Sequence, residues 1–206
     1  MCRHIIYNGT DIYIESLLFD IEQYLPLCNV DIVNKINHIS STRRIREIIM
    51  SHLLISKHIG EKAILCHSDI GAPYIKGNNC HISISHSSNQ IALAINRNSP
   101  IGIDLENWRE QLLKVKSRFL SNKEMKVYST PQLMLKAWTM KESLYKVAES
   151  PGISLVDDIM LPLDSECDIA NVNTLNGLKQ FSINSIESTE NYCLSIAQHY
   201  STSIVQ

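Results

Sequence analysis

The sequence lacks the features that would place it in a membrane or in a secretory pathway. No stretch of its 206 residues approaches the ~18 consecutive apolar residues that a membrane-spanning helix needs. Its first residues have no basic head followed by an apolar run, so we expect no signal peptide. We therefore expect a soluble cytoplasmic protein.

Paired cysteines and an excess of charge are also missing. The net charge is only −2 and charged residues do not gather in tails, so we expect no nucleic-acid partner. Six cysteines occur without any Cys-x-x-Cys spacing, which favours buried, reduced thiols over a zinc site or a disulfide framework: Cys2, Cys28, Cys66, Cys80, Cys167 and Cys193. Apolar residues make up 44% of the chain, enough for a core in one domain or two small ones.

Two short motifs carry the chemistry of the chain. The first is Ile-Gly-Ile-Asp-Leu-Glu at 101–106, in which aliphatic side chains alternate with Asp104 and Glu106. Side chains alternate across a strand, so both carboxylates should share one face while the aliphatics face a core.

The second motif is Trp-Thr-Met-Lys-Glu-Ser-Leu-Tyr-Lys at 138–146, in a strongly helical stretch. Glu142 and Lys146 are four residues apart, so they lie on one helix face. Three carboxylates suit a hard divalent cation, and a nearby lysine suits a phosphate bound to it. The motifs therefore indicate a magnesium-dependent enzyme that acts on a phosphate ester or anhydride.

Each motif also has a purely structural interpretation. Asp104 and Glu106 could form the solvated face of an edge strand, and Glu142 with Lys146 could be a surface ion pair worth ~0.3–0.5 kcal/mol.

The pattern of elements predicts an α/β (α+β) fold with two similar halves, 1–99 and 100–206, in a pseudo-two-fold arrangement with the site between them. In the first half we expect a helix at 43–58 and strands at 4–7, 12–19, 63–66, 81–85 and 90–95. In the second half we expect helices at 109–128 and 131–149, followed by a hairpin of 179–187 and 191–199. A groove between two halves is a natural place for a ligand.

At these motifs the chain resembles the 4′-phosphopantetheinyl transferases, whose signature is a Gly-x-Asp-x-Glu strand followed by Trp-x-x-Lys-Glu-x-x-x-Lys. Three further segments match in the correct order: the turn at 71–74, Ile84-Ser85-His86-Ser87, and Arg118-Phe119-Leu120-Ser121 with Glu124. The likeness runs from about residue 43 to 160, and five motifs in order are far more specific than any one. The chain's length is similar to that of two-lobed members, which implies a working monomer.

The resemblance implies transfer of the phosphopantetheine arm of coenzyme A to a serine of an apo acyl or peptidyl carrier protein. Adenosine 3′,5′-bisphosphate is the implied leaving product. Asp104, Glu106 and Glu142 would hold Mg²⁺, and Glu142 would act as general base. Lys146 would stabilise phosphate charge, and both Asp104 and Lys146 would contact the donor.

The resemblance also implies donor-binding residues in the first half. His86 would donate a hydrogen bond to the pyrophosphate, with Ser85 near the nucleotide end. Arg43 or Arg44 could reach the 3′-phosphate, although both could equally form a solvated helix face.

Two positions depart from the family pattern. Ala72 stands where a turn lysine is usual, and the helix arginine that often reaches the coenzyme falls at Ser51 or His52. These departures keep open a catalytically weak or inactive homologue that binds coenzyme A or a carrier protein. An unrelated metal-dependent phosphoesterase or nuclease with the same three acids is the other alternative.

The stretch after the first motif is locally basic. Lys114, Lys116 and Arg118 alternate with apolar residues there, which suits the acidic helix of a carrier protein. A soluble amphipathic helix that packs its apolar side inward is an equally good interpretation.

Overall fold

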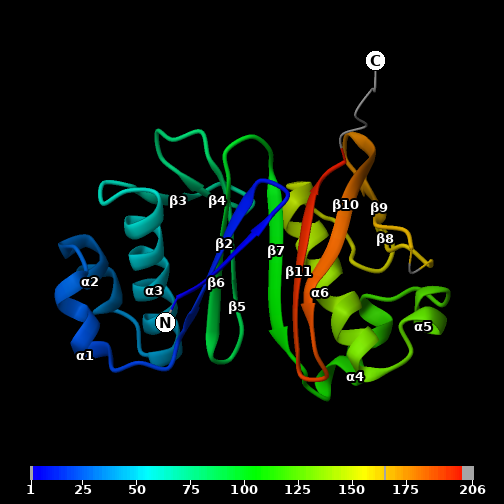
Figure 1. Cartoon of the computed structure of the whole chain (residues 1–206), viewed down its shortest axis with the longest axis horizontal. Helices are drawn as coiled ribbons and strands as arrows, with labels where there is room; N and C mark the ends of the chain where they lie inside the picture. Colours follow the sequence, from blue (N-terminus) through cyan, green and yellow to red (C-terminus); the bar gives the residue numbers. More distant parts are fainter. Residues whose placement is uncertain (1, 165, 201–206) are drawn as a thin grey trace. The chain divides into compact units, whose positions relative to one another are not determined.

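The chain folds into two units, Met1–Arg97 and Asn98–Gln206, each built from helices and an antiparallel sheet (Figure 1). The computed structural model describes residues 2–164 and 166–200. The predicted α/β (α+β) class is confirmed, whereas the pseudo-two-fold relation of two halves stays a prediction. No helix within these described residues is long and apolar enough to span a membrane.

A four-stranded sheet forms the centre of the N-terminal unit. Its strand order is β1 (Arg3–Tyr7), β2 (Thr10–Ser16), β6 (Gln90–Asn96) and β5 (His81–His86). The β1–β2 turn is made by Asn8 and Gly9, whose φ values of 43° and 74° are those that Asn-Gly adopts readily in a tight hairpin. The strands predicted at 4–7 and 12–19 thus form a hairpin, although the second begins at Thr10 and ends at Ser16.

Helix α3 (Thr42–His58) lies against one face of this sheet (Figure 1). Its start is capped by Ser41, whose hydroxyl oxygen accepts a hydrogen bond from the backbone N–H of Arg44 at 3.3 Å. Met50, Leu54 and Ile55 on its apolar side share one core cluster with residues of the sheet. These sheet residues are Ile82 of β5 and Ile91 and Leu93 of β6. The remaining elements of the unit are α1 (Ile21–Tyr24), η1 (Leu25–Leu27), α2 (Val30–Ile36), β3 (Leu65–His67) and β4 (Pro73–Ile75).

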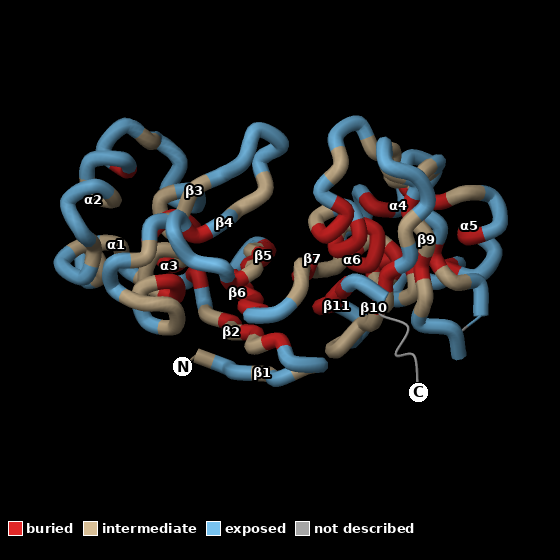
Figure 2. Tube along the Cα trace, turned by 90° about the horizontal axis from the view of Figure 1, so that it is seen from above, coloured by how far each residue is buried: buried red, intermediate tan, exposed pale blue. Residues whose placement is uncertain are grey.

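A five-stranded sheet forms the centre of the C-terminal unit. Its strand order is β7 (Ile101–Asn107), β11 (Tyr192–His199), β10 (Gly177–Ser188), β9 (Ile169–Thr174) and β8 (Ile159–Met160). Helix α6 (Pro131–Ala148) contacts all five strands. Figure 2 shows how much of α6 and β11 is buried in comparison with the largely exposed α2.

The continuous helix predicted over 109–128 is wrong. The segment is divided into α4 (Gln111–Val115), η2 (Lys116–Arg118) and α5 (Glu124–Val127). Ser121 and Glu124 cap each other in the turn that leads into α5. The Ser121 hydroxyl accepts a hydrogen bond from the N–H of Glu124 at 3.3 Å, and the Glu124 carboxylate accepts one from the N–H of Ser121 at 2.8 Å. This reciprocal capping satisfies backbone donors at a new helix start and therefore favours the break.

Candidate functional site

Strand β7 carries the first two predicted acids. Asp104 pairs in register with Ser195 of β11, and Glu106 pairs with Cys193. Ile103 and Leu105 alternate with them and are fully buried, whereas the Glu106 side chain keeps partial solvent contact. The alternation expected from the sequence is therefore present.

Gly102 allows helix α6 to pass unusually close to β7. A Cβ atom at this position would overlap the carbonyl oxygen of Ser143 and lie 2.8 Å from the backbone nitrogen of Val147. Any larger residue would push the helix away from the strand, so this glycine determines how near α6 comes to the acids of β7.

Buried hydroxyl groups fix the register of α6 on the sheet. The Oγ1 of Thr139 lies 2.7 Å from the Oγ of Ser195, and Ser143 donates to the carbonyl oxygen of Ser195 at 3.0 Å. These bonds tie one face of α6 to the β11 residue that pairs with Asp104. The helix thereby brings its next turns toward the carboxylates of β7.

Lys146 and Asp104 form the central ion pair of the site. The Lys146 ammonium donates to Asp104 Oδ1 at 2.8 Å and to the carbonyl oxygen of Ile103 at 2.8 Å. The two side chains are 28% and 11% exposed, so solvent still reaches the pair. The strand acid and the helix lysine that were predicted separately are thus in direct contact.

Glu142 lies close enough to both strand acids to feel their charge. Burial, followed by the charges of Asp104 and Glu106, raises its pKa from 4.5 to about 7, although Lys146 and Arg109 oppose the rise. Three carboxylates and two cations therefore form one electrostatic cluster, which we call the acid cluster: Asp104, Glu106, Glu142, Lys146 and Arg109.

Arg109 is a member of the cluster that the sequence did not indicate. Its Nη2 lies 3.1 Å from Glu106 Oε2, and its guanidinium stands 6.0 Å from the ring centre of Trp138. Trp138 in turn packs edge-on against Phe119, with ring centres 5.0 Å apart. The motif tryptophan therefore supports the site by packing, as an anchor beneath it would.

The residues of the acid cluster suit a divalent metal ion in their chemistry. Burial and the charges of the neighbouring carboxylates raise the pKa of Glu142, and Mg²⁺ or Mn²⁺ bound to the three acids would relieve the repulsion among them. In their present positions, however, no three His, Cys, Asp or Glu side chains of residues 2–164 and 166–200 are grouped so as to hold a metal ion. Lys146 and Arg109 pair with two of the acids instead, so binding of a metal ion by the three acids would require exchange of these ion pairs.

Lys141 of the second motif belongs to the core. Its side chain is 0% exposed and lies 2.8 Å from the Glu124 carboxylate, and it also donates to the carbonyl oxygens of Leu155 and Ile159. Glu124 accepts from the backbone N–H of Leu161 at 2.9 Å. This lysine therefore joins α6, α5 and the chain before β9, and does not face the acid cluster.

The predicted donor-binding residues of the N-terminal unit gather around one buried acid, Glu47. Arg43 and Arg44 each lie 3.0 Å from its carboxylate, and His86 Nδ1 lies 3.4 Å from it. Arg43 also donates to the carbonyl oxygen of Ser87 at 3.3 Å. The structure thus brings Arg43, Arg44 and His86 together, and Glu47 is the organising residue that the sequence pattern did not reveal.

Three other positions singled out in this unit, Ser85, Ser51 and Ala72, contact neighbouring parts of the fold in the bonds described next. Ser85 is buried on β5 beside Ala92 of β6. Ser51 donates its hydroxyl to the carbonyl oxygen of Glu47 at 2.7 Å, within helix α3. Ala72 lies in the turn before β4, where its N–H donates to the Ser68 hydroxyl at 3.1 Å.

In the basic stretch of the C-terminal unit, the cations and most of the apolar side chains lie on different sides. Lys114, Lys116 and Arg118 are exposed, whereas Leu112, Phe119 and Leu120 are buried in the core. Among the large apolar side chains of residues 112–120, Leu113 is the exposed one. The inward packing predicted as the structural interpretation is present, and the cations remain at the surface.

Comparison with known proteins agrees with the resemblance seen in the motifs. Residues 100–199 match the family model of the 4′-phosphopantetheinyl transferase superfamily. A 4′-phosphopantetheinyl transferase of Bacillus subtilis is 36% identical over 107 residues, which cover 47% of this chain and 43% of that protein. The match thus spans less than half of that relative. The matched region contains both motifs and the whole acid cluster.

Proposed function

We propose that the protein is a 4′-phosphopantetheinyl transferase that uses coenzyme A as donor and a serine of an apo acyl or peptidyl carrier protein as acceptor. The observation that supports this most strongly is the acid cluster, which lies within the region that matches the superfamily. Such a cluster suits chemistry at a pyrophosphate, where an alcohol must approach a phosphorus atom that is surrounded by negatively charged oxygens.

Asp104, Glu106 and Glu142 would hold the metal ion, for which Mg²⁺ is our proposal. When bound, magnesium supplies positive charge that neutralises the pyrophosphate of the donor. The exchange of ion pairs described above would leave Lys146 next to the bound phosphates, because its ammonium already lies within the cluster.

Glu142 is the proposed general base. In the reaction, the serine oxygen of the carrier forms a bond to the phosphorus that bears the pantetheine arm, and its proton passes to Glu142. The bond from that phosphorus to the oxygen of the leaving adenosine 3′,5′-bisphosphate breaks, and the electron pair stays with the leaving phosphate. Lys146 stabilises the charge that develops on this leaving group.

The N-terminal unit would supply contacts to the donor. Arg43 and Arg44 are proposed to bind the 3′-phosphate, since guanidinium groups oriented by Glu47 are suited to paired hydrogen bonds with phosphate. His86 would donate to the pyrophosphate, with Ser85 near the nucleotide end.

The exposed cations Lys114, Lys116 and Arg118 are proposed to meet the acidic surface of the carrier protein. On this proposal the protein acts in the cytoplasm as a monomer. Changing all three cations to Glu should raise the KM for the carrier much more than the KM for coenzyme A, and unchanged carrier kinetics would remove this assignment.

The test is incubation with a panel of apo carrier proteins, coenzyme A and Mg²⁺, followed by mass spectrometry of the carriers. We expect a gain of the phosphopantetheine arm on serine, which chelation of the metal abolishes. Release of free phosphopantetheine without any carrier would instead support a hydrolase.

A second candidate is a binding protein without transferase activity. It is favoured by Ala72 and Ser51, which replace cations usual at the donor site and which here make only short-range hydrogen bonds. Calorimetry that detects coenzyme A binding, together with no labelling of any carrier, would support this alternative.

A further inference from the structure

We propose that Arg109 is a ligand-binding residue of the acid cluster: it is the counter-ion of Glu106 in the metal-free protein, and metal binding releases it to bind the phosphates of the donor. This inference rests on the proposed function, because it assumes that the acids hold a metal ion and that the donor is a pyrophosphate.

The contacts of Arg109 leave much of its guanidinium accessible. One nitrogen, Nη2, pairs with Glu106 at 3.1 Å, and the group stands 6.0 Å from the Trp138 ring centre. The side chain is 49% exposed, so solvent reaches it beside these contacts. A planar group that is steadied by an aromatic ring and keeps further N–H donors accessible is well suited to a phosphate oxygen.

The pair is also built to exchange. Glu106 is 18% exposed, and a solvent-accessible ion pair contributes little to stability, so a divalent ion can replace the guanidinium at small cost. The other oxygen of Glu106 accepts from the backbone N–H of Asn107 at 3.0 Å, which keeps the carboxylate in place when the arginine leaves. Glu106 therefore remains a metal ligand whose orientation does not depend on Arg109.

The charge of the cluster gives the exchange a direction. Three carboxylates and two cations leave the metal-free cluster without net positive charge whether or not Glu142 carries a proton, so the cluster does not attract a pyrophosphate. A divalent ion changes this to one net positive charge and at the same time frees Arg109. The account thus predicts that metal binds first and that Arg109 acts on the donor only afterwards.

The experiment measures two affinities of the same variant by calorimetry: Mg²⁺ alone, and coenzyme A in saturating Mg²⁺. Arg109→Gln should bind Mg²⁺ alone about threefold more tightly, because a competing cation is lost. It should bind coenzyme A about tenfold more weakly, because a phosphate contact is lost. The opposite signs separate this role from a general structural defect, which would weaken both.

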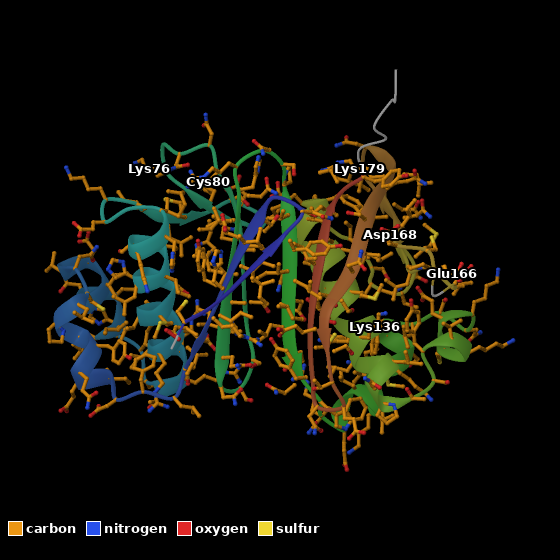
Figure 3. All side chains as sticks on the ribbon, viewed as in Figure 1. Lys76, Cys80, Lys136, Glu166, Asp168 and Lys179 are labelled. Carbon is orange, nitrogen blue, oxygen red and sulfur yellow. The ribbon has the colours of Figure 1, made fainter. Side chains whose placement is uncertain are left out.

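A matched control is Lys179→Gln, since Lys179 lies on β10, two strands away from β7 (Figure 3). It removes the same charge and should leave both affinities unchanged. Arg109→Lys keeps the charge without the planar fork, so it should restore the Mg²⁺ affinity of the wild type and recover only part of the coenzyme A affinity.

The outcomes distinguish this inference from the proposed function. If the wild type binds Mg²⁺ and coenzyme A but Arg109→Gln changes neither, or changes both in the same direction, the inference is wrong and the proposed function stands. If the wild type binds no divalent metal at all, the metal site fails and the inference fails with it.

Discussion

Two lysines on helix α6 form ion pairs of equal length and opposite character. Lys141 reaches Glu124 and Lys146 reaches Asp104, both at 2.8 Å. The Lys141 pair is 0% and 4% exposed and is completed by backbone carbonyl and N–H groups. The Lys146 pair is 28% and 11% exposed and is surrounded by further charges.

The difference shows that burial, and not the ion pair itself, separates a structural contact from a candidate functional one. A buried charge cannot leave its partner without a large desolvation penalty, so Lys141 is committed to the core. A partly exposed charge can change partners, so Lys146 is available to the metal-dependent reaction that we propose. Helix α6 thus presents a fixed lysine and an exchangeable one, five residues apart.

The largest expected effect comes from breaking the buried pair. Lys141→Met leaves the Glu124 carboxylate buried without its cation, and should lower the free energy of unfolding by about 3–5 kcal/mol. Urea denaturation measures this. The double variant with Glu124→Gln should recover part of the loss, and a single variant as stable as the wild type would contradict a structural role for the pair.

The next effect is the pH dependence that Glu142 contributes in metal-free protein. Because its folded pKa, about 7, lies above its ordinary value of 4.5, the folded protein binds this proton more tightly than the unfolded chain. The contribution is fully present below pH 4.5 and is lost as the pH rises to about 7, by at most about 3 kcal/mol.

Thermal or urea unfolding across this pH range tests the contribution. Glu142→Gln should remove this part of the pH dependence, and saturating Mg²⁺ should reduce it in the wild type. A variant with the same pH profile as the wild type would show that Glu142 does not titrate in this range.

Breaking the exposed pair should affect transfer more than folding. Lys146→Met is expected to lower kcat for carrier labelling by about 100-fold, since a charge that stabilises the leaving phosphate is lost. The free energy of unfolding should change by less than about 1 kcal/mol. If Lys146→Met instead destabilises the protein as much as Lys141→Met, the contrast between the two lysines disappears.

The smallest effect concerns the register of α6. Thr139→Val removes the buried hydroxyl that lies 2.7 Å from Ser195 and should cost about 1–3 kcal/mol, because Ser195 loses a partner in the core. Hydrogen exchange of α6 amides should rise in this variant. Ser182→Ala, on the partly buried side of β10, is a suitable control of similar size.

Periodicity was sufficient to predict which residues of the acid cluster share a face. Alternation along β7 placed the side chains of Asp104 and Ile103 on opposite faces of the strand. Four-residue spacing placed Glu142 and Lys146 on the same face of α6. The α/β class followed from the same patterns. These are local properties, and they depend only on the geometry of a strand or a helix.

The partners of charged residues could not be predicted in the same way. Glu47 is an acid in an amphipathic helix and resembles a solvated residue, yet it is buried by Arg43, Arg44 and His86 from two elements. The pairing of Arg109 with Glu106 falls at a strand end where no periodic pattern applies.

Gly102 illustrates the same limit for packing. In the sequence it is a small residue within a strand. Its importance comes from the close approach of the α6 backbone, which follows some forty residues later in the chain. Contacts between distant elements are decided by tertiary packing, which propensity and spacing do not encode.

The central claim, that three acids from β7 and α6 serve one ion, is tested most directly by calorimetric titration of Mg²⁺ into the wild type and into Asp104→Asn, Glu106→Gln and Glu142→Gln. We predict a single site in the wild type, weakened roughly tenfold or more by each substitution because each removes one oxygen ligand and its charge. Absence of binding to the wild type, or equal affinity in all four proteins, would contradict the account.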